Sequence, residues 1–258
     1  MLEVKNLQYA YKKNPVLKGV DFSAGAGQCV CLLGKNGAGK TTLFRCLLGF
    51  LDDYQGDIFI DGVNGRNLTA RELAKRIAYI PQAHAPTFNY TVFDIVLMGT
   101  NPHTDRFRSP GREQRRATMQ VLELMNILQL ADRGYAELSG GERQLTLIAR
   151  ALAQKSNILV MDEPTANLDY GNQLRVMRQV QELAKKGYLV VLSTHNPEHA
   201  LLYADKVLVL NEGTAMIYGT PHEVLSPELI EAVYGVSVTF QDIVTPWGSV
   251  PVFVPRFE

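Results

Sequence analysis

The sequence predicts an α/β protein with a parallel or mixed sheet and an inserted helical region. Residues 157–162 and 188–193 are continuous apolar runs, a pattern typical of strands buried on both faces of a parallel sheet. A helical pattern at 172–186 separates them and gives the strand–helix–strand order of a parallel pair. From residue 91 to 153 the apolar spacing is that of helices, which indicates an insertion that splits the α/β core.

Short strand patterns separated by turn residues fill the first sixty positions and predict an N-terminal antiparallel β subdomain. Strands are expected at 2–9, 19–23, 28–33, 56–60, 77–80 and 206–210. Helices are expected at 41–48, 69–78, from His199 onward and within 221–234, and residues 99–111 are expected to be a loop. The predicted organisation is one domain, 1–258, with an α/β core of 1–84 and 156–236, a helical subdomain of 85–155, and a tail of 237–258 that forms an edge strand or a packed segment.

Charge and cysteine content exclude several classes of function. The 26 basic and 26 acidic side chains balance, so the chain lacks the net positive field of a nucleic-acid-binding protein, and no nucleic-acid partner is expected. Cys29, Cys31 and Cys46 suit small buried side chains in a reducing compartment, and no nearby side chain completes a zinc site. The N-terminus has no signal-peptide pattern, and no apolar run approaches the ~18 residues that span a bilayer. Contact with a membrane is therefore expected to go through a partner.

Residues 34–42 fit the phosphate-loop pattern of two glycines followed by Lys and Thr. A predicted strand precedes the loop and a predicted helix follows it, so backbone N–H groups can form a nest for phosphate oxygens. Lys40 is expected to reach the β- and γ-phosphates of a nucleoside triphosphate, and the Thr41 hydroxyl to coordinate Mg²⁺. The alternative, a glycine-rich turn, is disfavoured by the flanking strand and helix. The predicted nucleotide-binding residues here are Gly34, Asn36, Gly37, Gly39, Lys40, Thr41 and Thr42.

Three further side chains are candidates for the same site. Tyr11, which ends the first predicted strand, is either a ring stacked on adenine or a core or edge tyrosine. Asp162 and Glu163 end a buried strand, where ligands of open α/β sheets collect. We expect Asp162 to hold Mg²⁺ through a water and Glu163 to polarise the water that attacks the γ-phosphate. The alternative for this pair is an acidic surface dipeptide.

Residues 138–144, Leu-Ser-Gly-Gly-Glu-Arg-Gln, reproduce the signature motif of the ATP-binding cassette (ABC) ATPases, and the chain resembles that family over about residues 2–236. Gln82, the Ala-Asn-Leu-Asp stretch at 166–169 and His195 fall in the family's order. The resemblance implies a P-loop NTPase core that binds ATP and Mg²⁺ and hydrolyses ATP. The chain departs from the family pattern at Asn196, commonly Asp, and at Leu145-Thr146, where many members have a basic residue first. Neither departure removes a catalytic group.

The resemblance also implies roles for further residues. Gln82 would contact Mg²⁺ or the attacking water and link the site to the helical subdomain. His195 would contact the γ-phosphate and hold the water together with Glu163. The signature motif would bind the nucleotide held by a second subunit, so the implied active species is a homodimer with two ATP molecules between its subunits. The additional nucleotide-binding residues implied are Ser139, Gly140, Gly141 and Asp169.

Shorter segments resemble the ATPase subunits of importers for iron–siderophore, haem, cobalamin and molybdate. These segments are residues 99–103, 168–173, 219–225 and 234–236. The resemblance implies two membrane-spanning permease subunits as direct partners and a periplasmic or extracellular substrate-binding protein as an indirect one. It also implies a peripheral location on the cytoplasmic face of the cell membrane. Two alternatives stay open: a soluble ABC ATPase without a permease, for cluster assembly or other remodelling, and the ATPase subunit of an exporter.

A basic cluster in the helical region is either a solvated face or a patch that binds phosphate or lipid. It consists of Arg106, Arg108, Arg112, Arg115 and Arg116. No functional role is predicted for His84, His103, His199 and His222.

Overall fold

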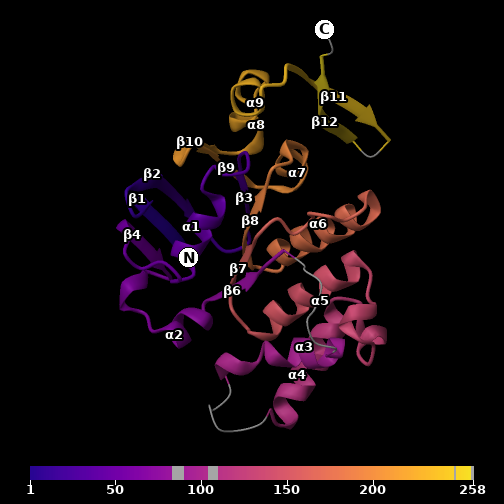
Figure 1. Ribbon diagram of the computed structural model, residues 1–258. Helices are drawn as coiled ribbons and strands as arrows, with labels where there is room; N and C mark the ends of the chain where they lie inside the picture. Colours follow the sequence, from indigo (N-terminus) through magenta and orange to yellow (C-terminus); the bar gives the residue numbers. More distant parts are fainter. Residues whose placement is uncertain (83–89, 104–109, 247, 257–258) are drawn as a thin grey trace.

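The computed structural model describes residues 1–82, 90–103, 110–246 and 248–256 (Figure 1). A six-stranded sheet runs through the molecule in the order β10-β9-β3-β8-β7-β6. Its neighbouring strands are parallel except for β10, which pairs antiparallel with β9. The strands are β3 (Cys29–Leu33), β6 (Ile77–Ile80), β7 (Ile158–Met161), β8 (Leu189–Thr194), β9 (Lys206–Asn211) and β10 (Thr214–Gly219).

A second sheet, antiparallel and N-terminal, lies beside the first in the order β2-β1-β4-β5 (Figure 1). Its strands are β1 (Leu2–Tyr11), β2 (Asn14–Ala24), β4 (Gln55–Ile60) and β5 (Val63–Asn64). Helix α1 (Lys40–Leu47) packs between the two sheets, because its Leu43 and Phe44 share one buried cluster with Leu7 of β1 and Leu32 of β3. The predicted mixed α/β class with an antiparallel β subdomain is thus confirmed.

The alternation of side chains along the central strands divides the core into two clusters. Cys29, Cys31 and Leu33 of β3 face one cluster, whereas Val30 and Leu32 face the other, on the α1 side. Every residue of β3, β7 and β8 is buried. Burial on both faces is the reason why these segments read as continuous apolar runs.

The helical region lies at one end of the molecule and comprises α3 (Val92–Met98), α4 (Arg112–Leu124) and α5 (Gly140–Ala153) (Figure 1). Helix α6 (Tyr170–Lys185) packs with α5 on one face of the central sheet. Gly99, the C-cap of α3, allows close approach to α5, because a Cβ there would lie 2.0 Å from the backbone oxygen of Arg150. At the end of α5 the Gln154 side chain donates hydrogen bonds to the carbonyls of Ala74 and Ile77, at 2.5 and 2.8 Å. These bonds tie the helical region to the segment that enters β6.

Two helices differ in extent from the expectation. The helix expected at 69–78 is only α2 (Ala70–Ala74), because Ile77 already pairs with Ile158 of β7. The helix expected from His199 begins earlier, as α7 (Pro197–Tyr203), with the Asn196 side chain accepting a 2.8 Å hydrogen bond from the backbone N–H of Glu198. The remaining helices are α8 (Pro221–Val224) and α9 (Pro227–Tyr234), with short 3₁₀ turns at Gly65–Asn67, Asn101–His103, Leu128–Leu130 and Tyr135–Glu137.

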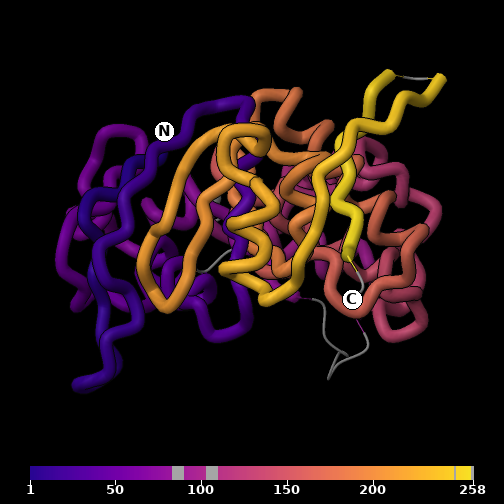
Figure 2. The backbone as a smooth tube through the Cα atoms, turned by 90° about the horizontal axis from the view of Figure 1, so that it is seen from above, coloured from indigo at the N-terminus to yellow at the C-terminus, as the bar shows by residue number. Residues whose placement is uncertain are grey.

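The C-terminal segment, expected to be an edge strand or a packed tail, forms an antiparallel hairpin of β11 (Val238–Thr245) and β12 (Gly248–Pro255). Its Val238 and Phe253 are buried in the same hydrophobic cluster as α7 and α9, so the base of the hairpin is packed on the core. The hairpin projects from the body of the molecule beyond α9 (Figure 2). Phe240 and Phe253 form its apolar contact, with ring centroids 5.6 Å apart. None of the helices in the described ranges is long and apolar enough to cross a bilayer.

The described part of the basic cluster is exposed. Arg112, Arg115 and Arg116 lie on the solvent side of α4, and the Arg115 guanidinium sits 5.8 Å from the ring centre of Phe93. This arrangement favours the solvated helix face. Arg106 and Arg108, like His84, lie outside the described residues.

Candidate functional site

The phosphate-loop sequence connects the buried end of β3 to the start of α1. Gly37 and Gly39 have φ of 84° and 101°, a left-handed conformation that glycine adopts without steric cost. A Cβ on Gly34 would lie 2.4 Å from the backbone oxygen of Leu210 at the end of β9, so only glycine fits there. The backbone N–H of Gly213 donates to the Ala38 carbonyl at 3.1 Å and supports the loop from outside. The loop therefore has the open backbone that an anion nest requires.

Lys40 begins α1 and turns its side chain back into the loop. Its Nζ donates to the carbonyls of Gly34 and Lys35, at 2.6 and 3.0 Å, and lies 3.8 Å from Oε1 of Glu163. The side chain is only 6% exposed. Burial lowers the pKa of Lys40, and the carboxylates of Glu163 and Asp162 oppose that shift. The ammonium is thus held where phosphate oxygens over the loop would meet it.

Thr41 and Asp162 meet as expected for a metal site. The Thr41 hydroxyl donates to Oδ2 of Asp162 at 3.2 Å, although the two residues lie 121 positions apart. Both are hard oxygen donors of the kind that Mg²⁺ prefers. No group of three or more His, Cys, Asp or Glu side chains suited to a metal occurs within the described ranges. The pair fits Mg²⁺ because that ion is bound by one or two protein oxygens together with substrate phosphates.

Ser193, near the end of β8, supports both acidic residues and was not identified from the sequence. Its hydroxyl donates to Oδ1 of Asp162 at 2.7 Å and accepts from the backbone N–H of Glu163 at 2.9 Å. The side chain is fully buried. A hydroxyl residue near the carboxyl end of an otherwise apolar strand is the signal that could have pointed to it.

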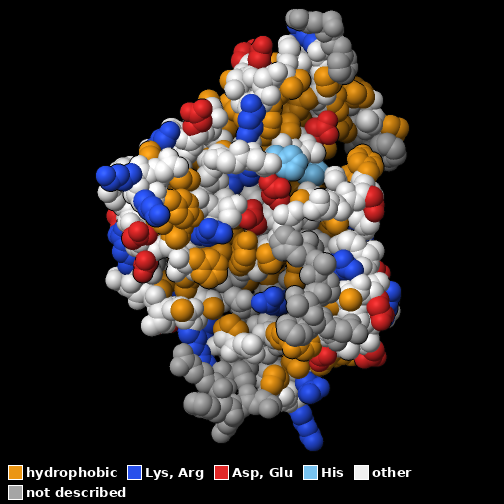
Figure 3. Space-filling model, in the orientation of Figure 1, with side chains coloured by type: hydrophobic (Ala, Val, Ile, Leu, Met, Phe, Trp, Pro, Cys, Tyr) orange, Lys and Arg blue, Asp and Glu red, His pale blue; other side chains and the backbone are white. Residues whose placement is uncertain are grey.

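Glu163 and His195 lie side by side just beyond β7 and β8. Nδ1 of His195 is 3.4 Å from Oε2 of Glu163, and their side chains are 58% and 22% exposed. Glu163 has a φ of 44°, which is uncommon for a residue with a side chain and is often found at functional positions. On the face shown in Figure 3, acidic side chains and histidine lie together over the central strands. The structure thus brings together Glu163 and His195, the two residues expected to hold the attacking water, and their roles with that water stay predictions.

Gln82 lies two residues beyond the end of β6 and is partly buried. The neighbouring strand continues into Asp162, whose backbone N–H donates to the Ile80 carbonyl at 2.9 Å. Gln82 therefore lies at the same edge of the sheet as Asp162. Its contact with a metal or a water stays a prediction.

Tyr11 ends β1 with its ring partly exposed. It packs edge to face on Tyr9, with centroids 5.0 Å apart at 82°. The Tyr11 hydroxyl accepts a 3.3 Å hydrogen bond from Nη1 of Arg45 on α1. Tyr11 thus lies at the end of an interior strand with a partly exposed ring, and stacking on adenine stays a prediction.

The signature motif forms the N-terminus of α5. Ser139 is the N-cap: its hydroxyl accepts from the backbone N–H of Glu142 at 3.3 Å, and the Glu142 carboxylate accepts from the backbone N–H and hydroxyl of Ser139, both at 2.8 Å. Hydrogen bonds from Ser139, mainly from its backbone, lower the pKa of Glu142. Ser139 and Gly140 are exposed, so the dipole end of α5 is open to an anion.

Gly141 packs directly on Asn172 of α6, a residue that sequence reasoning missed. A Cβ on Gly141 would lie 2.2 Å from Oδ1 of Asn172. Asp169, the N-cap of α6, accepts bonds from the backbone and side-chain N–H groups of Asn172, at 2.9 and 2.7 Å. The structure thus joins Gly141 to Asp169 through Asn172. Within the part of the chain that the structure describes, no hydrogen bond or ion pair links this group to the phosphate loop.

Gly141→Ala is expected to weaken ATP-dependent dimerisation about tenfold or more, since overpacking such a contact costs about 1–3 kcal/mol. The new methyl group would displace Asn172 from Asp169 while leaving the phosphate loop untouched, so ATP affinity of the monomer should stay within about twofold. Light scattering with ATP and Mg²⁺ measures the dimer. Gly171→Ala is the matched control, because its Cβ would meet Oδ1 of Asp169 at an ordinary 3.6 Å. Normal dimerisation of Gly141→Ala would contradict the packing argument.

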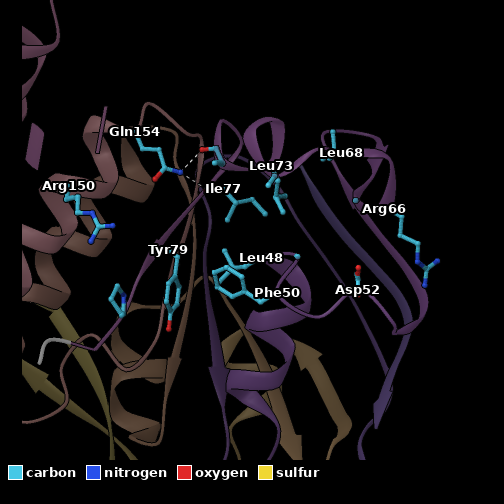
Figure 4. Close-up of a pocket in the computed structure, with 15 residues that line it drawn as sticks. Leu48, Phe50, Asp52, Arg66, Leu68, Leu73, Ile77, Tyr79, Arg150 and Gln154 are labelled. Atoms are coloured by element: carbon cyan, nitrogen blue, oxygen red, sulfur yellow. Dashed lines mark hydrogen bonds between the residues drawn. The ribbon is translucent and has the colours of Figure 1, made fainter. Parts of the chain in front are cut away.

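A pocket of about 500 Å³ lies beside the nucleotide-binding elements, between the end of α1, the segment after β5 and the end of α5 (Figure 4). In Figure 4 the side chains of Leu48, Phe50, Leu73, Ile77 and Tyr79 lie around it, and Arg66 and Arg150 lie on opposite sides. Phe50 is 68% exposed, which is high for a large apolar side chain. A pocket with an apolar floor between charged rims is suited to bind a side chain or a short helix of a partner protein.

The chain is similar to known proteins of one family. The family model described as ABC transporter matches residues 17–166. A Hemin import ATP-binding protein of Rhodococcus jostii is 38% identical over 86% of this chain and 75% of its own length. A Molybdate import ATP-binding protein of Haemophilus influenzae is 34% identical over 100% of this chain and 97% of its own length. A solved structure of a metal-chelate type ABC transporter in an inward-facing conformation matches with a TM-score of 0.89 and 33% identity, over 100% of this chain and 98% of that chain.

Proposed function

This chain belongs to the ABC transporter ATPase family, and we propose that it is the ATP-hydrolysing subunit of a membrane importer for a metal chelate or an oxyanion. The observation that carries the proposal is the convergence of Lys40, Glu163 and His195 beside the Thr41–Asp162 pair. The relatives named for hemin and molybdate import support the direction of transport and the two cargo classes.

Each residue of the site has a separate role in the transfer of the γ-phosphoryl group to water. Loop amides and the Lys40 ammonium bind the β- and γ-phosphate oxygens. Mg²⁺, held by Thr41, Asp162 and Gln82, would neutralise charge that develops on those oxygens. Glu163 takes the proton of the attacking water as general base, and His195 orients that water and the γ-phosphate. The Tyr11 ring is the proposed adenine platform.

The proposed active species is a homodimer that binds two ATP molecules. Ser139 and Gly140 are exposed at the start of α5, and Asp169 is exposed at the start of α6. These groups would complete the site of a second copy, with the α5 N-terminus facing its γ-phosphate. Each copy has one phosphate loop and one signature motif, so a two-fold axis makes both sites complete.

The pocket around Phe50 is the proposed docking site for a membrane-spanning subunit. Its apolar floor fits the apolar face of a short helix, and Arg150 can pair with an acidic side chain at the rim, whereas Arg66 is already engaged with Asp57 and Tyr54. Two permease subunits would bind the homodimer, which places the chain peripherally on the cytoplasmic face of the membrane. A periplasmic or extracellular binding protein would act on the permease and would not contact this chain.

Phe50→Asp tests this docking site. Placing a carboxylate at the mouth of the apolar pocket should lower recovery of a membrane-spanning partner at least about tenfold, because burying an unpaired charge costs several kcal/mol. ATP affinity should not change. Recovery from detergent-solubilised membranes of the source cell is measured by mass spectrometry. Val244→Asp is the control, since Val244 is 85% exposed on the distant hairpin. Equal recovery with wild type and Phe50→Asp would exclude this pocket as the docking site.

A further inference from the structure

Two polar contacts join the segment that carries Glu163 to the segment that carries His195. The first is the partly exposed contact between these two side chains, at 3.4 Å. The second lies two and four residues further on, where the Thr165 hydroxyl is 3.4 Å from Nδ1 of His199. Thr165 and His199 are only 6% and 8% exposed. A buried polar contact therefore joins the same two segments as the solvent-open pair of the site.

Thr165 lies in a tight turn that begins at Glu163. The backbone N–H of Ala166 donates to the Glu163 carbonyl at 3.0 Å. Two residues later, the backbone N–H of Leu168 donates to the Thr165 carbonyl at 3.3 Å. Glu163 and Asn167 have positive φ, 44° and 60°, and residues with side chains keep this conformation only where their surroundings hold them. Holding Thr165 thus constrains the backbone that carries the Glu163 side chain.

His199 lies in the middle of α7, four residues after His195. Ala200 and Leu201 of the same helix are buried in the cluster that fills one side of the central sheet, so α7 is anchored by side chains other than His199. The His199 ring packs edge to face on Tyr203, with centroids 6.4 Å apart at 72°. The imidazole therefore has a fixed place on an anchored helix, from which it can hold Thr165.

The His199 imidazole is suited to bond a hydroxyl. Burial, and to a smaller extent the neighbouring His195, lowers the pKa of His199, so the ring is neutral at neutral pH. A neutral imidazole has one N–H donor and one acceptor nitrogen, whereas a threonine hydroxyl both donates and accepts. The pair can consequently bond in either tautomer of the ring, and the bond offsets the cost of burying the two polar groups.

We propose that His199 is a positioning residue for ATP hydrolysis: through Thr165 it fixes the turn that carries Glu163 relative to the segment that carries His195. The inference rests on the proposed function, because it takes Glu163 and His195 as the pair that holds the attacking water. A water held by both must lie within hydrogen-bond reach of each, so a small displacement of the turn weakens both contacts. The solvent-open pair contributes little to that spacing by itself, since exposed ion pairs are weak.

Thr165→Val removes the hydroxyl and keeps the shape of the side chain. The kcat for ATP is expected to fall about three- to tenfold, the range of a net hydrogen bond, and Thr165→Ser, which keeps a hydroxyl, should restore most of the loss. ATP affinity measured by titration calorimetry should stay within about twofold of wild type in both variants, because the phosphate loop is not altered. Thr118→Val is the matched control, since that buried hydroxyl donates to the Gln114 carbonyl within α4.

Nitrogen-15 NMR of the histidine rings tests the contact without any turnover. The Nδ1 signal of His199, identified by its absence in His199→Leu, should shift in Thr165→Val and return toward its wild-type position in Thr165→Ser. The ring signals of His195 should shift in Thr165→Val as well, which a purely local packing role of Thr165 would not cause. Turnover of the double variant Thr165→Val/His199→Leu should be no lower than that of His199→Leu, because both changes remove the same bond.

The outcomes separate this inference from the proposed function. Wild-type turnover in folded Thr165→Val, or unchanged His195 signals, would overturn the positioning role. A loss of ATP affinity as large as the loss of turnover would also overturn it, because the change would then have distorted the whole site. Absence of ATP hydrolysis in wild type would contradict the proposed function and the role in hydrolysis with it, while the His199 signal would still decide whether the hydroxyl and the ring are bonded.

Discussion

Glu163→Gln is expected to bind ATP normally and to hydrolyse it about 10²–10⁴-fold more slowly, the usual contribution of a general base. The amide keeps the size of the side chain beside His195 and Lys40 but cannot accept a proton from water. Because closure around ATP would then not be followed by hydrolysis, the protein should accumulate as a dimer. Phosphate release and light scattering measure the two effects.

Glu198→Gln is the control for this substitution. Glu198 is an exposed acid at the start of α7, three residues from His195, and the same chemical change there should leave turnover within about twofold, as for most surface substitutions. Near-normal turnover of Glu163→Gln would remove Glu163 as the base.

Lys40→Ala should abolish measurable ATP binding, a loss of at least about a hundredfold in affinity. The ammonium is the buried cation of the loop, and its partners are the loop carbonyls that phosphate oxygens would replace. Without it the phosphates would face the carboxylates of Asp162 and Glu163 with no compensating charge. Titration calorimetry with ATP and Mg²⁺ provides the measurement.

The neighbouring lysine gives the matched control for Lys40. Lys35 lies in the same loop with an exposed side chain, so Lys35→Ala should retain ATP affinity within about fivefold, the range of an exposed charge contact. Thermal melting establishes that both variants fold. ATP binding by folded Lys40→Ala within tenfold of wild type would contradict the assigned role.

Local sequence was sufficient to predict the phosphate loop and the buried strands. The loop is a contiguous stretch whose glycines set its backbone, and strands buried on both faces have continuous apolar runs, as at β7 and β8. The antiparallel subdomain was predicted from short strand patterns separated by turns. The helical region was predicted because the spacing of apolar residues changes there to that of helices. Asp162 and Glu163 were predicted because they end such a run.

Features that depend on distant parts of the chain were not predicted. Ser193 and Asn172 act through contacts across strands and helices, and only the position of Ser193 near the end of an apolar strand gave a local signal. The pocket around Phe50 is formed by segments as far apart in the sequence as Leu48 and Gln154. The shorter extent of α2 also followed from tertiary structure, because pairing with β7 takes Ile77 into a strand.

The most direct test of the importer function is an affinity pull-down of tagged Glu163→Gln from detergent-solubilised membranes of the source cell, with ATP and Mg²⁺ present, followed by mass spectrometry. The proposal predicts recovery of a polytopic permease in complex with the dimer, and the identity of that permease would narrow the cargo between a metal chelate and an oxyanion. Recovery of soluble scaffold proteins or ribosomes without any integral membrane partner would contradict the importer function, and the ATPase assignment would stand without it.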